Sequence, residues 1–146
     1  MSRKESDGYS PAAGMGKSDY EKLSRFRYQL RRFLRVSEDV CRAHGVTPLQ
    51  YQLLLQVMGT PGREWSSIGE IAEKLQAKHH GVVALIDRCE KLDLVERQPG
   101  QSDRRQVEIH LLPKGRKLLE QLATLHQPEL LLLQEAFTAP ARAGSE

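Results

Sequence analysis

Apolar residues recur at alternating three- and four-residue steps through the first part of the chain. The residues with this spacing are Leu23, Phe26, Leu30, Phe33 and Val40. This narrow seam, broken once at Ser37, is typical of a helix that packs against another helix. Ser18 is its expected N-cap, with Glu21 at the capping-box position three residues later, and Gly45 is expected to end it.

Two shorter helices are predicted next. Thr47 and Pro48 supply a cap and a first-turn proline for the apolar stretch LQYQLLLQVM, which ends at Gly59. After a turn-rich segment, SSIGEIAEKL has Ser67 as its expected cap and Glu70 at the capping-box position. These signals place one helix on each side of the turn.

A further helix, KHHGVVALIDRCEKLD, follows after only Gln76 and Ala77. Two helices joined so tightly are typical of the helix-turn-helix unit, whose second helix enters the major groove of DNA. The apolar residues at the positions this geometry needs are Ile71, Ala72, Leu75, Ala77, Val82 and Leu85. The predicted buried stripe of the second helix is Val82, Leu85, Ile86, Cys89 and Leu92. Its opposite face carries Lys78, His79, His80, Val83, Ala84 and Asp87, although a polar outer face is common on any surface helix.

The period then changes to the two-residue alternation of strands. Val95 begins one run, and the apolar residues Val107, Ile109 and Leu111 alternate with polar ones in the next. The two runs form a predicted hairpin whose turn contains Pro99-Gly100 and the polar stretch QSDRR. A hairpin directly after a helix-turn-helix makes a winged helix, and an arginine at its tip suits the narrow, electronegative minor groove.

A final helix is predicted from Pro113. Pro128 should kink or split it, because proline removes a backbone hydrogen bond and disfavours helix at the preceding residue. Four leucines, residues 130–133, point all around this helix, so one buried face of a monomer cannot cover them. Packing the two terminal helices against those of a second copy would cover these leucines and the seam of the first helix.

Composition fits one mainly helical domain with a small hairpin. The chain has 146 residues, 28% of them charged and 5% aromatic, and a formal net charge of +3. The positive balance is compatible with an anionic partner. The sequence has neither an apolar run of the roughly 20 residues needed to cross a bilayer nor an apolar signal segment, so we expect no membrane contact and a cytoplasmic location. Two cysteines, Cys41 and Cys89, are too few for a disulfide framework and suit a reducing compartment.

Catalytic and metal-binding patterns are missing from the sequence. His79 and His80 are adjacent, so on a helix they point roughly 100° apart and cannot easily share a metal ion. Zinc-protease, nucleophile-elbow and glycine-rich phosphate-loop motifs do not occur. His44, His110 and His126 stand alone. We therefore expect no enzymatic activity, no metal and no cofactor.

Three segments together resemble the MarR (multiple antibiotic resistance regulator) family of transcription factors. The most specific is LIDRCEKLDLVERQPGQSDRRQVEIHLLPKGRKLL, which resembles the family's run from recognition helix through the wing, including its Asp-x-Arg signature. GVTPLQYQLLLQV resembles the family's second helix, and IGEIAEKL the first helix of its DNA-reading pair. The resemblance covers roughly residues 20–137. It implies a winged helix-turn-helix flanked by dimerisation helices.

The resemblance also implies roles at the wing. Asp103 is expected to pair with one arginine and fix the wing, leaving the other to enter the minor groove. We assign Arg104 to the tip and Arg105 to the ion pair, with the reverse left open. A solvated turn with a weak exposed ion pair is the alternative.

Other candidate DNA contacts lie on the helix-turn-helix. Lys78, His79 and His80 begin the recognition helix and are candidates for base edges or phosphates, and Val83 and Ala84 share their face. Further candidates are Arg88 and Arg97, expected to face phosphate or form salt bridges, and Ser66 and Ser67, expected to donate to phosphate or only to cap a helix.

Several residues depart from the family pattern. Asp93 replaces a glycine before the Leu-Val-x-Arg segment, so that helix end should be strained or differently capped. Leu112 replaces a threonine cap, at a cost on the order of 1 kcal/mol. His80 and Gly81 replace small hydroxyl residues, and Ala84 stands where arginine is frequent. The DNA sequence that is read should therefore differ, and the early end of the chain leaves little room for a separate final helix.

The predicted organisation is a mobile tail at 1–17, dimerisation helices at 18–45 and 113–138, a winged helix-turn-helix at 46–112 and a flexible tail at 139–146. The expected function is a homodimeric regulator, a repressor, that binds double-stranded DNA at a pseudo-palindromic operator with half-sites roughly 34 Å apart.

Family members commonly release DNA when a small, often aromatic, ligand binds between the dimer helices and the winged helix. Tyr28 and Tyr51 are candidates to line such a cleft here, or they are core residues. Two alternatives remain open: a thiol-based redox sensor using Cys41, helped by Arg42 and His44, and an interaction module that keeps the fold without binding DNA.

Overall fold

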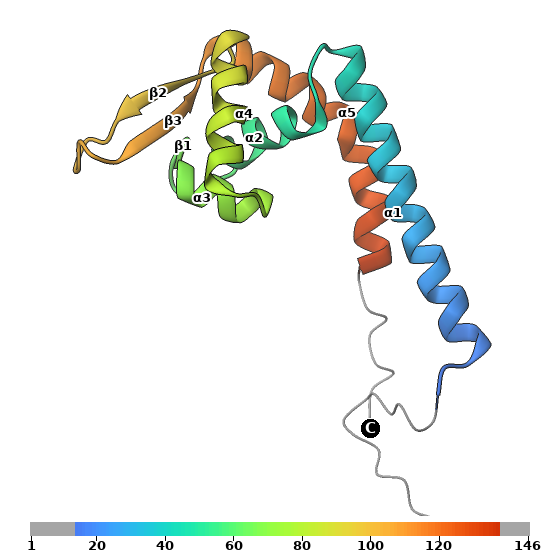
Figure 1. The fold of residues 1–146 in the computed structure, drawn as a ribbon. Helices are drawn as coiled ribbons and strands as arrows, with labels where there is room; N and C mark the ends of the chain where they lie inside the picture. The colour runs from blue at the N-terminus through green and yellow to red at the C-terminus, as the bar shows by residue number, and fades with distance from the viewer. Residues whose placement is uncertain (1–13, 138–146) are drawn as a thin grey trace, which may run out of the picture. The chain divides into compact units, whose positions relative to one another are not determined.

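The structure is a computed structural model that describes residues 14–137, with only the backbone described at residues 129, 132, 133, 136 and 137. Of the predicted tails, residues 1–13 and 139–146 lie outside this range, whereas residues 14–17 are described and Lys17 already belongs to the first helix. The helices in the described range are α1 (Lys17–Ala43), α2 (Pro48–Met58), α3 (Ile68–Leu75), α4 (His79–Lys91) and α5 (Pro113–Phe137). The strands are β1 (Trp65–Ser67), β2 (Val95–Pro99) and β3 (Val107–Leu111) (Figure 1).

The chain divides into two compact units, and the boundaries fall inside the long helices. One unit is Val36–Pro128, which holds the end of α1, the winged helix and the first part of α5. The other contains, in the described range, residues 14–35 and 129–137. The predicted boundaries at residues 45 and 113 therefore differ from those of the compact units.

Two capping boxes form: the one predicted at Ser67, and one at Thr47, for which the sequence predicted only a cap. At the start of α2, the Gln50 N–H donates to Thr47 Oγ1 at 3.1 Å, and the Thr47 N–H donates back to Gln50 Oε1 at 3.0 Å. At the start of α3, the Glu70 N–H donates to Ser67 Oγ at 3.2 Å, and the Ser67 N–H donates to Glu70 Oε1 at 3.3 Å. Each box satisfies two backbone donors that the helix itself cannot.

The predicted cap at Ser18 is wrong, because α1 begins one residue earlier, at Lys17. The Gly16 N–H donates to Asp19 Oδ2 at 3.0 Å, so the acid three residues after Gly16 supplies the reciprocal bond of the cap. At the other end the prediction is correct. Gly45 has φ +77°, and its N–H donates to the Arg42 carbonyl oxygen at 3.1 Å.

Two other helices end on left-handed residues that are not glycine. Gln76 after α3 has φ 51°, and Asp93 after α4 has φ 59°. The Gln76 side-chain Nε2 donates to the Glu73 carbonyl oxygen at 2.8 Å, and Lys114 Nζ donates to the Leu92 carbonyl oxygen at 2.9 Å. The unusual cap predicted at Asp93 is therefore present, with the ammonium group of α5 satisfying a carbonyl at the end of α4.

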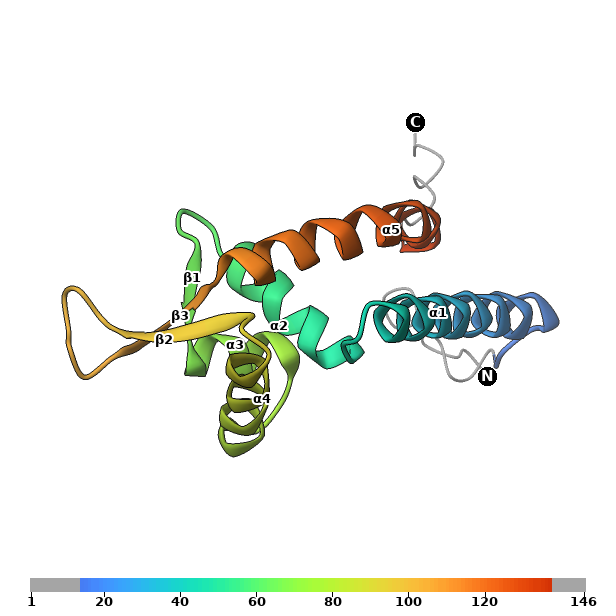
Figure 2. The same cartoon turned by 90° about the horizontal axis from the view of Figure 1, so that it is seen from above.

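The sheet has a third strand that the sequence did not reveal. β1 pairs antiparallel with β3, with Ser66 opposite Ile109, and β2 pairs with the other edge of β3, giving the order β1-β3-β2. Three residues are too few to show a two-residue period, so β1 could not be recognised. The wing formed by β2 and β3 projects beyond α3 and α4, as the view from above shows (Figure 2).

The expected start of α5 at Pro113 is correct, but a split at Pro128 is not. The helix runs from Pro113 to Phe137 with Pro128 inside it. Proline removes only one backbone bond of the helix, and the neighbouring turns continue on both sides. The boundary between the two compact units follows directly after Pro128.

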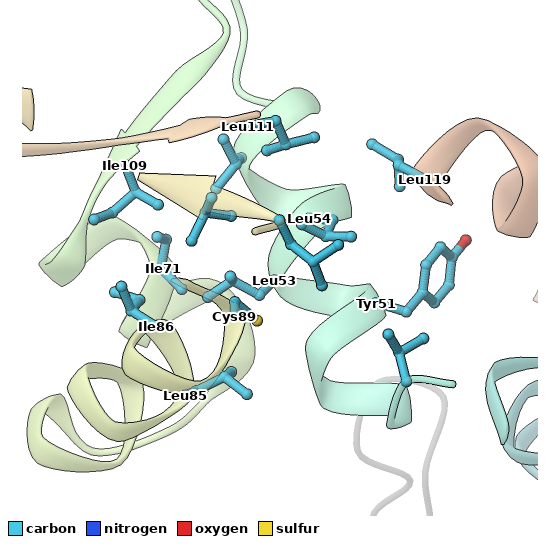
Figure 3. Close-up of a cluster of buried hydrophobic side chains, with 14 of the residues drawn as sticks. Tyr51, Leu53, Leu54, Ile71, Leu85, Ile86, Cys89, Ile109, Leu111 and Leu119 are labelled. Atoms are coloured by element: carbon cyan, nitrogen blue, oxygen red, sulfur yellow. The ribbon is translucent and has the colours of Figure 1, made fainter. Parts of the chain in front are cut away.

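The core of the larger unit lies where α2, α3, α4, β3 and α5 meet (Figure 3). Leu53 and Leu54 of α2 face Ile71 of α3, Ile86 of α4 and Ile109 of β3, and all five are at most 1% exposed. One residue of the predicted stripe is misplaced: Leu92 is 37% exposed, because the chain turns at Asp93, and Leu94 is buried.

The break in the α1 seam at Ser37 has a structural reason. Ser37 is buried, and its Oγ lies 2.8 Å from Nε2 of the buried His126 of α5. The other ring nitrogen, Nδ1, donates to the Leu122 carbonyl oxygen at 2.7 Å, and the ring stacks on Tyr51 with 4.4 Å between centroids. His126 and Tyr51 are therefore core residues, and the predicted candidate Tyr28 is exposed.

Candidate nucleic-acid interface

The first turn of α4 is open to solvent. Lys78 is the N-cap and α4 begins at His79, one residue later than predicted. Lys78, His79 and His80 are exposed, and the Lys78 side chain makes no capping hydrogen bond within the described part of the chain. The first backbone N–H groups of a helix carry partial positive charge, so this turn can receive an anion together with the Lys78 ammonium group.

The remaining residues of α4 divide as its helical period requires. Val82, Leu85, Ile86 and Cys89 are buried against the core. Val83 and Ala84 are half-buried, whereas Asp87 and Arg88 are exposed. The structure therefore places the predicted recognition residues on one side of α4. The small side chains of Val83 and Ala84 are closer to the protein core than the exposed polar ones.

The wing tip, residues 100–106, has a defined backbone. The Gly100 N–H donates to the Gln106 carbonyl oxygen at 2.7 Å, and the Gln106 N–H donates to the Asp103 carbonyl oxygen at 3.0 Å. A Cβ atom at Gly100 would lie 2.3 Å from the Asp103 carbonyl oxygen, so this crossing requires glycine. The turn is thereby closed at its base.

Asp103 organises the tip through the backbone of Arg105. The Arg105 N–H donates to Asp103 Oδ1 at 3.0 Å, and Arg105 Nε lies 3.6 Å from the same oxygen. The Arg105 side chain is 95% exposed, so the ion pair itself contributes little. Arg104 is exposed and makes no hydrogen bond or ion pair with any residue that the structure describes.

Ser66 does not fit the predicted contact with phosphate. It lies in β1, is 2% exposed, and its hydroxyl group is hydrogen-bonded to the Thr60 hydroxyl group. Ser67 is half-buried, and its hydroxyl group already accepts the Glu70 N–H. Ser66 is therefore a structural residue, and the capping interpretation accounts for Ser67.

Arg88 and Arg97 differ in their surroundings. Arg88 is exposed on α4. Arg97, on β2, donates from Nη2 to Asp87 Oδ1 at 2.8 Å and contacts Glu90 through Nη1. Arg97 was expected either to face phosphate or to form salt bridges, and the structure contains the salt bridges.

Comparison with known proteins adds to this geometry. The model of the MarR family matches residues 44–106, which run from the end of α1 to the wing tip. The uncharacterized HTH-type transcriptional regulator YsmB of Bacillus subtilis is 32% identical over 106 residues, covering 68% of this chain and 66% of that protein. The chain belongs to the MarR family. It spans just under two thirds of the length of this relative.

Solved structures of MarR-family proteins share the fold. AbsC from Streptomyces coelicolor aligns with a TM-score of 0.70 at 19% identity, covering 86% of this chain and 84% of AbsC. A mutant of MarR from E. coli complexed with operator DNA aligns with a TM-score of 0.63 at 21% identity, covering 84% of this chain and 86% of that one. The predicted fold, a mainly helical winged helix-turn-helix with long terminal helices, is confirmed.

A buried carboxylate in β3 of this MarR-family chain, paired with the partly exposed His110, escaped the sequence prediction. Glu108 of β3 is 5% exposed, and its Oε1 lies 2.9 Å from Nε2 of His110. Its Oε2 accepts the Gln101 N–H at 3.4 Å, which ties the strand to the wing loop. The strand period placed both residues on the polar face. The burial of Glu108 could not be seen because β1, which pairs with this strand, was not recognised.

Neither cysteine has the surroundings of a reactive thiol. Both are fully buried. Burial raises the pKa of the Cys41 thiol, which a hydrogen bond to Ser37 partly opposes, and burial raises the pKa of Cys89 from 9.0 to about 11. A raised pKa leaves little of the nucleophilic thiolate at neutral pH, so the redox alternative loses its chemical basis in this conformation.

A small cavity of about 220 Å³ opens beside the end of α4. Val46, Leu94 and Leu118 supply apolar walls, and Lys114 and Lys117 of α5 stand beside them. Within the described range, no group of three or more His, Cys, Asp or Glu side chains could hold a metal ion. No described helix is both long and apolar enough to span a bilayer.

Proposed function

We propose that this chain is a homodimeric, sequence-specific DNA-binding regulator of transcription, acting as a repressor. The observation that carries this proposal is the wing tip. It presents the exposed side chains of Arg104 and Arg105 on a backbone fixed by Gly100 and Asp103. A cation held on a narrow loop suits the minor groove, where the negative potential is greatest.

The recognition helix supplies the second contact. Lys78, His79 and His80 stand at the exposed start of α4, the part of a recognition helix that reaches base edges. Val83 and Ala84 extend this face as small, half-buried residues, and Arg88 is the exposed cation farther along. Such a regulator acts where the chromosome lies, and a cytoplasmic location is part of the proposal.

Exposed apolar side chains support a dimer. On α1, Tyr20, Leu23 and Leu34 are each more than half exposed, and Leu130 and Leu131 of α5 are about half exposed. Exposed apolar residues gathered on long helices indicate an interface with another chain. A two-fold dimer would repeat the wing and recognition helix at a second half-site.

We further propose that a small ligand controls DNA release through the cavity beside α4. Its walls join the connection between α1 and α2, the end of α4 and the start of α5, with Leu92 and Leu94 flanking the turn that leads into the wing. A molecule bound there would contact the end of the recognition helix directly. It would lower DNA affinity by favouring a different position of that helix.

The test is selection of bound sequences from a random pool of DNA duplexes with the purified protein. A symmetric enriched motif is expected, with two half-sites about one helical turn apart. Absence of enrichment, together with no salt-dependent binding to random duplex, would instead indicate an interaction module that keeps the fold.

The wing assignment has its own test, Arg104→Ala. Affinity should fall for the selected duplex and for a scrambled one, and the slope of log K against log salt should become shallower by about 1, because one cation near phosphate is lost. Arg42→Ala, on α1, is the matched control and should bind as wild type. Fluorescence anisotropy at several salt concentrations measures both, and unchanged binding by the Arg104 variant would contradict the assignment.

A further inference from the structure

Asp87 is an acid on the face of α4 that carries the candidate DNA contacts. It lies seven residues after His80, which is two helical turns, so both side chains project from the same side of the helix. Both residues are exposed. An unpaired carboxylate at this place would repel the phosphates of a duplex bound along that face.

Arg97 of β2 neutralises this carboxylate. Its Nη2 donates to Asp87 Oδ1 at 2.8 Å, and its Nη1 contacts Glu90 Oε1. The Arg97 and Glu90 side chains are about one third exposed, and that of Asp87 is 53% exposed. A planar guanidinium that is shared by two carboxylates and partly removed from water is held more firmly than the exposed pair at the wing tip.

The backbone keeps this guanidinium beside α4. Only three residues, 92–94, separate α4 from β2, and they turn sharply at the left-handed Asp93. β2 therefore begins against the end of α4, and Arg97, the middle residue of this edge strand, stands opposite Ile109 of β3. To reach a phosphate, the guanidinium would have to leave Asp87 and Glu90 unpaired.

We propose that Arg97 is a positioning residue for DNA binding, which acts by masking the Asp87 carboxylate from the duplex and makes no phosphate contact of its own. This inference rests on the proposed function. It also separates two acids that share one partner. Asp87 is 53% exposed and lies two turns from His80, whereas Glu90 is 33% exposed and lies in the last turn of α4, farther from the candidate contacts of the first turn.

The test compares Arg97→Gln alone and combined with Asp87→Asn or with Glu90→Gln. The probe is a mixed-sequence duplex of about 30 base pairs, and the readouts are anisotropy and the thermal midpoint. Arg97→Gln should weaken binding about tenfold, because it leaves a charge unpaired. Adding Asp87→Asn should restore affinity to within about threefold of wild type, and adding Glu90→Gln should leave it near that of Arg97→Gln.

Two results would overturn this inference. If neither double variant recovers affinity and Arg97→Gln also makes the salt slope shallower by about 1, Arg97 contacts phosphate itself. If both double variants recover affinity in step with their thermal midpoints, Arg97 acts only through stability. Failure of the wild-type protein to bind the probe in dilute buffer is a separate result, which would overturn the proposed function first.

Discussion

The missing side chains of two glycines shape the base of the wing. A Cβ atom at Gly115 would lie 2.1 Å from the Leu94 carbonyl oxygen, and one at Gly100 would lie 2.3 Å from that of Asp103. Both distances are far below van der Waals contact, so the start of α5 and the wing tip close against backbone that any other residue would displace. The position of the exposed arginines therefore depends on residues that make no contact with DNA in the proposed mode.

Cys89 gives a pH dependence with a definite sign. Its pKa rises from 9.0 to about 11 on burial, so the folded protein binds its proton more tightly than the unfolded chain does. This contribution to stability is complete below about pH 9 and is lost as the pH rises toward 11. Between about pH 8 and about pH 10.5 the loss should amount to about 2 kcal/mol.

Urea unfolding of wild type and Cys89→Ala in the presence of a reductant measures this term. Tyrosine and lysine titrations affect both proteins alike, so the difference in unfolding free energy isolates the thiol. Wild type should be the more stable protein at about pH 8, since the variant leaves a cavity, and its advantage should shrink as the pH rises. A difference that stays constant across this range would contradict the assignment.

At the scale of the elements, helix starts marked by a capping side chain could be predicted from the sequence. The short strand β1, which depends on backbone pairing alone, could not. The boxes at Thr47 and Ser67 follow from residue types at fixed spacing. Ser18 satisfied the same rule and was wrong, because Gly16 with Asp19 forms a competing start two residues earlier. β1 was not predicted, because three residues are too few to show a two-residue period. The burial of Ser66 and Glu108, which depends on β1, was therefore not predicted either.

The residues of the candidate site could be predicted from the sequence, but the ion pairs and hydrogen bonds among them could be predicted only in part. Lys78, His79, His80 and Arg104 are exposed where the pattern placed them. The attachment of Arg97 to Asp87 joins residues ten positions apart on a helix and a strand. Such a pairing depends on how sharply the chain turns at Asp93, which the period of either element does not specify.

A substitution at Ser67 can distinguish its role as the cap of α3 from the alternative role of contacting phosphate. Ser67→Ala removes the acceptor of the Glu70 N–H and should lower the unfolding free energy by about 1 kcal/mol. DNA affinity at a temperature well below the midpoint should stay unchanged, because the hydroxyl group is occupied within the cap. Denaturant titration and anisotropy together measure this. A loss of affinity with unchanged stability would instead show that Ser67 contacts phosphate.

At the scale of the whole molecule, three of the exposed apolar residues of α1 lie on one side of the helix. Tyr20, Leu23 and Leu34 fall within about 60° of its circumference at 3.6 residues per turn. Each is more than half exposed. This face has the character of an interface, and its partner in the proposal is a second copy of the chain.

Leu23→Glu tests that partner, because a charge in an apolar interface is costly unless it is paired. Wild type should have twice the chain mass of 16.6 kDa in light scattering, and Leu23→Glu should have the mass of one chain. Operator affinity should fall by roughly a hundredfold, since the second half-site then binds independently.

Leu49→Glu is the matched control: Leu49 is equally apolar and 49% exposed, but it lies at the start of α2, where an acid suits the helix dipole. It should stay dimeric, and a dimeric Leu23 variant with full affinity would place the subunit contact on another surface.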